Sequence, residues 1–201
     1  QGSTTVFLGT SGCGKTTLMR MVNAMVTPTS GTVFVRGADV TGADPVRLRR
    51  SIGYVLQEGG LFPHRSIADN IATVPRLEGV NKAESRERAL ELLTLVGLER
   101  EMADRYPSQL SGGQRQRVGV ARALANRADI LLMDEPFGAL DPIVRADLQR
   151  ELKEIRRALG TTILFVTHDV DEAFTLGDQV AVLSTGGSIE PVGTPAELLS
   201  S

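Results

Sequence analysis

The sequence is poor in cysteine and has no long hydrophobic run. Its one cysteine, Cys13, cannot form an internal disulfide, which excludes a disulfide-stapled secreted fold and favours a reducing compartment such as the cytoplasm. No apolar run approaches the roughly 18 residues that a membrane span needs, and residues 1–9 lack the basic start and apolar stretch of a secretory signal. We therefore expect any role at a membrane to depend on a partner.

A surplus of positive charge is also missing. The chain carries 22 Lys and Arg against 24 Asp and Glu, a formal net charge of −2, so it lacks the basic excess of a typical nucleic-acid-binding protein. We expect no nucleic-acid partner. The length of 201 residues allows one domain with a full core, or one domain with an inserted lobe.

Strand-like and helix-like stretches alternate along the chain. In residues 67–126 the pattern is helical, with apolar residues at three- and four-residue spacing that end at Gly97. We predict an α/β fold with a mostly parallel sheet, built from a core at 1–66 and 127–201 and a helical subdomain at 67–126. Strands are predicted at 6–8, 32–35, 52–56, 130–133, 162–166 and 180–183, a first helix at 15–26, and subdomain core positions at Ala89, Leu92, Leu93 and Val96.

Two more helices are predicted towards the C-terminal end. The first is amphipathic, ends at Gly160 and connects two predicted strands in a right-handed crossover. The last begins at a capping box with Thr194 at N-cap, and the glycine-rich residues 186–188 before it are typical of a hairpin turn. The apolar face of the first helix comprises Leu148, Leu152, Ile155 and Leu159.

Residues 9–16, GTSGCGKT, match the phosphate-binding pattern G-x-x-x-x-G-K-[ST] between a predicted strand and a predicted helix. A plain glycine-rich turn is the alternative, but glycines here let backbone N–H groups converge on phosphates while Lys15 adds a positive charge. Thr16 is a candidate Mg²⁺ ligand, and we interpret Cys13 as filling the loop rather than as a redox group. This pattern predicts a P-loop NTPase (RecA-like) core whose ATP-binding residues are Gly9, Thr10, Ser11, Gly12, Cys13, Gly14, Lys15, Thr16 and Thr17.

Two adjacent carboxylates, Asp134 and Glu135, end the predicted strand at 130–133. Neighbouring side chains of a strand point to different sides, so the two can do different work. Asp134 is a candidate Mg²⁺ ligand and Glu135 a candidate group to polarise an attacking water. By itself such a pair is equally typical of a solvated strand end, and the phosphate loop upstream favours the catalytic interpretation.

Residues 110–117, LSGGQRQR, precede a predicted helix and present a second helix N-terminus that suits an anion. This segment resembles the signature of ABC ATPases, and it ends 17 residues before Asp134, as in that family. The resemblance implies a head-to-tail dimer of two copies, with each ATP between one copy's phosphate loop and the other copy's signature. The signature residues that would contact the γ-phosphate in trans are Ser111, Gly112, Gly113 and Gln114.

The resemblance also implies roles for residues elsewhere in the chain. Gln57 would be the lid glutamine that senses Mg²⁺ and the attacking water, and His168 the switch histidine that contacts the γ-phosphate. A lone histidine after a strand is more often structural, but its place in this order favours the switch. The loop Ala139–Leu140–Asp141 would cross the dimer interface. A nucleic-acid stripe is the poorer interpretation of Arg115, Arg117 and Arg122, which we expect on a solvated or inter-subunit helix face.

Within the ABC ATPases, residues 52–64, 69–75 and 133–142 look most like the subunits that power osmoprotectant importers for glycine betaine, choline, carnitine or proline. The resemblance implies Mg²⁺ with ATP, transmembrane permease subunits, indirectly a substrate-binding protein, and a place at the cytoplasmic face of the membrane. The alternative to a surface that contacts a membrane partner is that Leu61, Phe62 and Pro63 form an apolar patch that only packs the helical lobe.

Other functions remain open at this point. An ABC ATPase of another importer, for amino acids, sugars or other small solutes, shares all these motifs. A soluble ABC ATPase of translation or DNA repair shares the chemistry but usually has two cassettes, a coiled-coil insertion or a basic arm. A P-loop kinase needs an acceptor pocket and has no use for residues 110–117. The adenine-stacking aromatic of the family precedes the phosphate loop, so we expect it, with an N-terminal hairpin, before residue 1.

Overall fold

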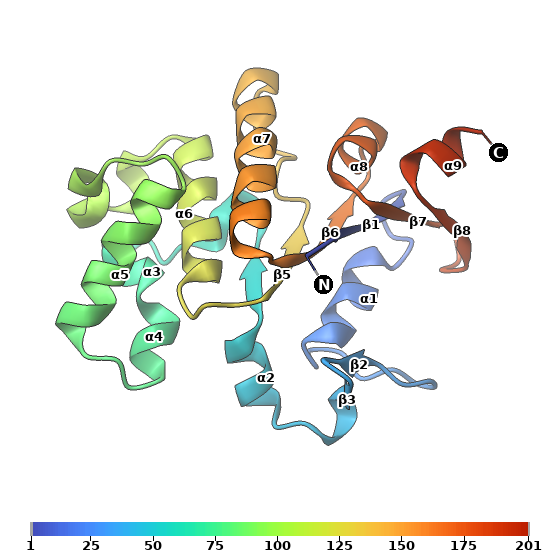
Figure 1. Ribbon diagram of the computed structural model, residues 1–201, viewed down its shortest axis with the longest axis horizontal. Helices are drawn as coiled ribbons and strands as arrows, with labels where there is room; N and C mark the ends of the chain where they lie inside the picture. The colour runs from blue at the N-terminus through green and yellow to red at the C-terminus, as the bar shows by residue number, and fades with distance from the viewer. Residues whose placement is uncertain (1, 201) are drawn as a thin grey trace.

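A six-stranded sheet organises the computed structural model, which describes residues 2–200 (Figure 1). The strand order is β4-β5-β6-β1-β7-β8, and every neighbouring pair is parallel except the antiparallel β7–β8 hairpin. The predicted α/β fold with a mainly parallel sheet is confirmed. The strands are β1 (Thr4–Gly9), β4 (Gly53–Val55), β5 (Ile130–Asp134), β6 (Thr162–Thr167), β7 (Gln179–Leu183) and β8 (Ile189–Gly193).

The strands form where they do because their side chains are buried on both faces of the sheet. Leu131 packs in one apolar cluster and its neighbour Leu132 in the other, on the opposite face. β1 lies at the centre, between β6 and β7, so these two strands are the neighbours that a central position requires. Its carboxyl end therefore delivers the phosphate loop to the middle of the sheet edge.

Helices cover both faces. Figure 1 shows α7 (Pro142–Leu159) and α8 (Val170–Leu176) above the sheet and α1 (Lys15–Val22) below it. The apolar face of α7 is buried at Leu148, Leu152 and Ile155, but Leu159 is 48% exposed, which corrects its place in the predicted stripe. The stripe fails there because Gly160, with φ of 64°, ends the helix at the next residue.

The helical lobe lies at one side of the sheet (left in Figure 1). Ala89, Leu92 and Leu93 are buried in its core, as the spacing predicts. The lobe comprises α3 (Ile67–Ile71), α4 (Thr73–Leu77), α5 (Lys82–Leu95), 3-10 turns at Arg100–Asp104 and Pro107–Gln109, and α6 (Gly112–Leu124). Because α6 also packs against β4 and the turn Gln57–Gly60, the exact division of core and subdomain at 66/67 and 126/127 stays a prediction.

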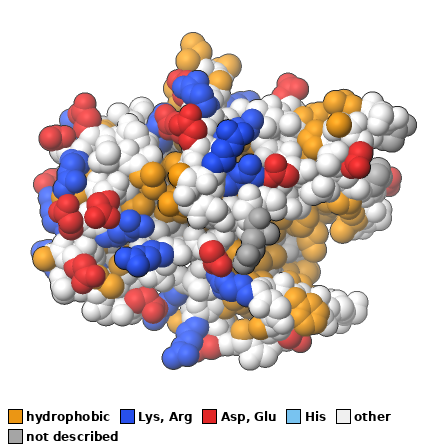
Figure 2. All heavy atoms as spheres, in the orientation of Figure 1, with side chains coloured by type: hydrophobic (Ala, Val, Ile, Leu, Met, Phe, Trp, Pro, Cys, Tyr) orange, Lys and Arg blue, Asp and Glu red, His pale blue; other side chains and the backbone are white. Residues whose placement is uncertain are grey.

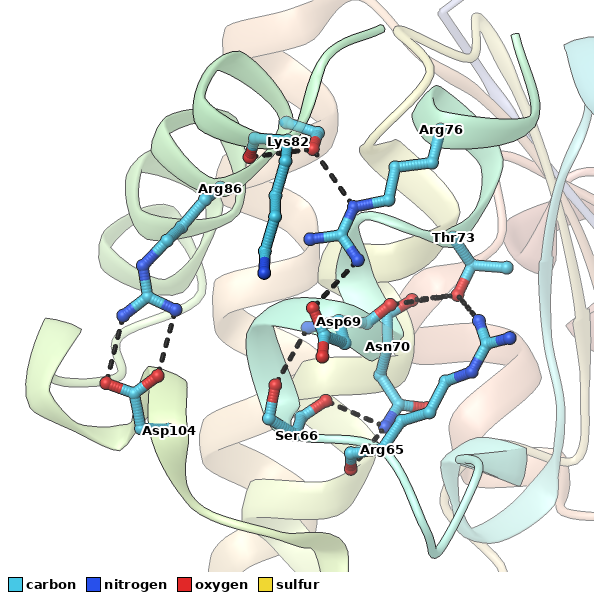
Figure 3. A network of polar contacts seen from close by, with 10 residues as sticks. Arg65, Ser66, Asp69, Asn70, Thr73, Arg76, Lys82, Arg86 and Asp104 are labelled. Carbon is cyan, nitrogen blue, oxygen red and sulfur yellow. Dashed lines mark hydrogen bonds and ion pairs between the residues drawn. The ribbon is translucent and has the colours of Figure 1, made fainter. Parts of the chain in front are cut away.

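Polar contacts stiffen this lobe (Figure 3). The Asn70 side chain is fully buried, and its Nδ2 donates to the carbonyls of Phe62, Arg65 and Ser66 at 3.0–3.1 Å while its Oδ1 accepts from the Phe62 N–H at 2.7 Å. One amide therefore fixes the turn at residues 62–66. Exposed ion pairs, Arg76–Asp69 and Arg86–Asp104, add to the same network.

Smaller elements flank the core. The strand predicted at 32–35 has only two residues, β2 (Phe34–Val35), and pairs with β3 (Ala38–Asp39) in a separate hairpin. A 3-10 turn (Val40–Gly42) leads to α2 (Pro45–Ser51), which the apolar spacing did not predict although Asp44 and Pro45 are a sequence signal for a helix start. The capping box at Thr194 begins α9 (Pro195–Leu199) as predicted. Across residues 2–200, every helix is too short or too polar to cross a bilayer.

Candidate active site

The phosphate loop joins β1 to α1 in a tight turn that requires glycine. A Cβ on Gly9 would lie 2.6 Å from the Leu183 carbonyl oxygen, and Gly14 has φ of 100°. Inside this turn Lys15 is only 4% exposed, and its Nζ donates to the carbonyls of Gly9 and Thr10, each at 2.8 Å. The loop thus holds a buried positive charge at the N-terminus of α1.

Asp134 lies beside the loop at the carboxyl end of β5. The Thr16 hydroxyl donates to Asp134 Oδ1 at 2.9 Å, and the Tyr54 hydroxyl donates to Oδ2 at 3.5 Å. Arg20 Nε donates in turn to the Tyr54 oxygen at 3.5 Å. Burial raises the pKa of Tyr54, which keeps its hydroxyl a neutral donor. Sequence reasoning missed Tyr54 and Arg20; the signal for Arg20 was its place one helical turn after Thr16.

A cleft of about 450 Å³ opens at this point, between the start of α1, the end of β5 and residues 56–60. The candidate Mg²⁺ ligands Thr16, Gln57 and Asp134 all line it, and their hydroxyl, amide and carboxylate oxygens are donors that Mg²⁺ prefers. Among the described residues no cluster of three or more His, Cys, Asp and Glu side chains forms a metal site. The donor set therefore fits a Mg²⁺ ion that takes its remaining ligands from phosphates and water. The cleft is lined by Thr16, Leu56, Gln57, Gly60, Asp134 and Glu135.

Glu135 contacts His168, whereas Asp134 contacts Thr16. Its Oε1 lies 3.3 Å from His168 Nδ1, and its backbone N–H donates to the Val166 carbonyl at 3.0 Å. The Glu135 backbone has φ of 44°, a left-handed conformation that disfavours residues with a Cβ and costs of order 1–3 kcal/mol. This kink separates the two carboxylates, so that one meets Thr16 and the other meets the histidine.

The signature residues stand at the start of α6, in the other lobe. Ser111 is the N-cap: its Oγ accepts from the Gln114 N–H at 3.2 Å, and Gln114 Oε1 accepts from the Ser111 N–H at 2.9 Å. A Cβ on Gly113 would lie 2.5 Å from Val144 Cγ1, so only glycine allows α6 to approach α7 here. Figure 1 places α6 and α1 on opposite sides of β5 and α7. The structure does not bring these residues to the phosphate loop of the same chain.

Arg117 and Arg122 are only partly exposed and bond to groups within the chain, so they are not freely solvated, and a place at an inter-subunit face stays a prediction. Arg117 pairs with Glu151 and donates to the Val96 carbonyl at 2.9 Å, while Arg122 donates to the carbonyls of Gly59 and Gly60 at 2.7 and 2.9 Å. Their guanidinium groups satisfy loop carbonyls that lack backbone partners. On the face shown in Figure 2, Lys and Arg side chains are interspersed with Asp and Glu rather than gathered in one stripe.

Asp141 ends the loop that follows Asp134 and Glu135. Its Oδ1 accepts from the N–H groups of Ile143 and Val144, each at 3.1 Å, and so caps α7. The neighbouring Leu140 side chain lies 3.7 Å from the Cβ position of Gly112. The loop is thereby held next to the signature residues, and its place in a dimer interface stays a prediction.

The comparisons with known proteins agree with this geometry. The family model described as "ABC transporter" matches residues 1–138. The chain belongs to the ABC transporter family. A glycine betaine/carnitine/choline transport ATP-binding protein of Bacillus subtilis is 53% identical over 99% of this chain and 52% of its own length. An osmoprotectant import ATP-binding protein of Salmonella typhimurium is 47% identical over 100% of this chain and 52% of its own. The chain thus spans about half the length of these relatives.

Solved ABC structures share the fold, which confirms the P-loop NTPase class. A Clostridium perfringens protein that is part of an ABC transporter complex superposes with a TM-score of 0.90 at 30% identity, over 100% of this chain and 80% of its own. A dimeric ATP-binding cassette in a post-hydrolysis state, bound to ADP and Pi, gives a TM-score of 0.83 at 34% identity, over 96% of this chain and 86% of its own.

Proposed function

We propose that this chain is the ATP-binding and ATP-hydrolysing part of an ABC importer for a quaternary-ammonium osmoprotectant such as glycine betaine, choline or carnitine, or for proline. The observation that carries the ATPase proposal is one cleft at the carboxyl edge of the sheet. Thr16, Gln57 and Asp134 line it, and Glu135 lines it while contacting His168. These groups are what water attack on a γ-phosphate needs in one place.

In this proposal each polar residue of the cleft has a separate role in binding or hydrolysis. Lys15 and the backbone N–H groups of the loop hold the β- and γ-phosphates, and Thr16 and Asp134 hold Mg²⁺, with Gln57 as a further ligand from the lid. The ion supplies neutralisation of phosphate charge when bound. Glu135 accepts a hydrogen bond from the attacking water, and His168 fixes the Glu135 carboxylate and reaches the γ-phosphate.

A second copy of the chain completes the site. The helix N-terminus of α6 suits a phosphate, and it lies in the other lobe from Lys15. A head-to-tail homodimer lets Ser111, Gly112, Gly113 and Gln114 of one copy face the ATP of the other. The dimeric ADP- and Pi-bound relative supports this arrangement.

The relatives' names and the turn at residues 62–66 support the proposed permease partners and cargo. Phe62 is 39% exposed on a turn that Asn70 fixes from inside, which suits docking against transmembrane permease subunits. The chain would then work at the cytoplasmic face of the membrane, with a substrate-binding protein as an indirect partner. Relatives that transport glycine betaine, carnitine and choline favour this cargo over other amino acids or sugars, and over a soluble ABC ATPase.

The substitution Glu135→Gln tests the proposed chemistry. It keeps the shape of the side chain but removes the base, so MgATP turnover should fall at least 100-fold while MgATP affinity stays within about twofold. An ATP-bound dimer should accumulate, seen by light scattering after size-exclusion chromatography. The control is Glu154→Gln at an exposed position of α7. Turnover that survives in Glu135→Gln removes Glu135 from this role.

The cargo is tested on the assembled transporter. A tagged chain, copurified with its membrane partners and placed in proteoliposomes with its substrate-binding protein, should hydrolyse ATP faster with glycine betaine, choline, carnitine or proline than with maltose or histidine. Stimulation by maltose or histidine alone would favour another importer class, and failure to copurify with any membrane protein would favour a soluble ATPase.

A further inference from the structure

Three charged side chains, Arg145, Asp169 and Glu172, cluster beside the turn that carries His168, and none of them lines the cleft at Thr16 and Asp134. Glu172 of α8 is 4% exposed, which is rare for a carboxylate, and Arg145 reaches it from the neighbouring helix α7. Asp169, directly after the histidine, is the third member. A buried carboxylate with charged partners beside a catalytic turn calls for a specific role.

The cluster holds the turn that carries His168 from both sides. The Thr167 hydroxyl donates to Glu172 Oε2 at 2.6 Å and accepts from the Asp169 N–H at 3.0 Å. Asp169 Oδ1 caps α8 by accepting from the N–H groups of Asp171 and Glu172 at 2.9 and 3.1 Å. The backbone on each side of His168 is thereby fixed, which sets the direction of its ring towards Glu135.

Arg145 connects this turn to the loop before α7. Its Nη1 lies 3.4 Å from Asp169 Oδ2, and its Nη2 donates to the Leu140 carbonyl at 3.2 Å. Leu140 precedes Asp141, and its side chain lies against Gly112 of the signature. One guanidinium therefore contacts both the histidine turn and the loop expected at the dimer interface.

The third contact of Arg145, with Glu172, is too long for a hydrogen bond. Its Nε is buried without a hydrogen-bond partner and lies 3.8 Å from Glu172 Oε1, beyond hydrogen-bond distance. A shift of less than 1 Å between α7 and α8 would turn this ion pair into a hydrogen bond. The distance between Arg145 Nε and Glu172 Oε1 can thus shorten or lengthen when the loop at Leu140 moves.

We propose that Arg145 is a positioning residue that ties the interface loop at Leu140 to the turn of the switch histidine, so that docking of a second copy sets His168 for hydrolysis. This inference rests on the proposed function, because it assigns Arg145 to the same ATPase site. Arg145 does not line the cleft at Thr16 and Asp134, and its proposed action runs through Asp169, Glu172 and the Leu140 carbonyl.

The test compares Arg145→Gln and Arg145→Lys with Arg150→Gln. Arg150 lies on the same helix and pairs with Asp147 at the surface, so it controls for loss of one α7 ion pair. We expect saturating MgATP turnover to fall roughly tenfold in Arg145→Gln, with the ATP affinity of the monomer within about twofold. Lysine should restore part of the turnover, because an ammonium pairs with one carboxylate but cannot span all three partners.

A second readout does not depend on turnover. The chain has two histidines, so the ring resonance of His168 can be followed by NMR with His64 as an internal reference. In Arg145→Gln the His168 resonance should shift or broaden while that of His64 stays in place. Turnover within twofold of wild type, or an unchanged His168 resonance in a folded variant, overturns the inference. A wild type without MgATP turnover overturns the proposed function instead, and the histidine resonance still tests the link.

Discussion

Two helix N-termini of the molecule suit a phosphate, and they are built differently. The first end is the phosphate loop between β1 and α1, and the second end is the start of α6 at Ser111. At the end of β1, charged and polar groups from separated segments meet, with Lys15 inside its loop, Asp134 against Thr16 and Glu135 against His168. At the start of α6, the side chains of Ser111 and Gln114 accept from each other's backbone N–H groups, and Gly113 packs against Val144. The first end gathers the groups proposed to act on ATP, and the second offers only a helix N-terminus. In the proposed head-to-tail dimer, the second end of one copy meets the first end of the other.

The largest expected effect comes from the charge at the first end. Lys15→Met removes the buried ammonium that we propose holds the phosphates, so MgATP affinity should fall at least 100-fold, measured by titration with a fluorescent nucleotide. Lys82→Met, at an exposed position of α5, should leave affinity unchanged. The comparison fails if Lys15→Met binds MgATP as tightly as the wild type.

A smaller effect is expected at the second end, and only on turnover. In Ser111→Asp the side chain can still cap α6, but it sets a negative charge where the γ-phosphate of the other copy would lie. Turnover should fall roughly tenfold or more while the monomer binds MgATP as before. Ser111→Thr, which keeps a hydroxyl cap, should retain most activity. Loss of monomer binding in Ser111→Asp would place Ser111 at the same ATP as Lys15 and remove the distinction.

The same contrast explains what the sequence predicted and what it did not. The phosphate loop, Asp134 and the cap at Ser111 depend on neighbours in the chain, so short patterns revealed them. Tyr54 joins the site through the pairing of β4 with β5, which no local pattern encodes, whereas Arg20 lies one turn after Thr16 on α1, a local signal that only the contact with Tyr54 makes meaningful. The partners of Arg122 were not predicted because they, the carbonyls of Gly59 and Gly60, lie about sixty residues away in the sequence.

The smallest expected effect concerns the stability of the first end and its dependence on pH. Burial raises the pKa of Glu172, and the hydrogen bond from Thr167 and the charges of Arg145 and His168 only partly oppose this, while Asp169 adds to it. The folded state therefore favours the protonated carboxyl, and the free energy of unfolding should fall as pH rises from the ordinary glutamic acid pKa through the higher folded value.

Glu172→Gln removes this titration. Its unfolding free energy relative to wild type should therefore rise between pH 4 and pH 7, measured by urea unfolding at each pH, while Glu154→Gln at the surface of α7 should follow the wild type. The opposite slope, with Glu172→Gln losing stability relative to wild type as pH rises, would mean that pairing with Arg145 lowers the folded-state pKa of Glu172 more than burial raises it. The cluster beneath His168 would then stabilise the fold through its charges, and Arg145→Gln should show the same pH dependence.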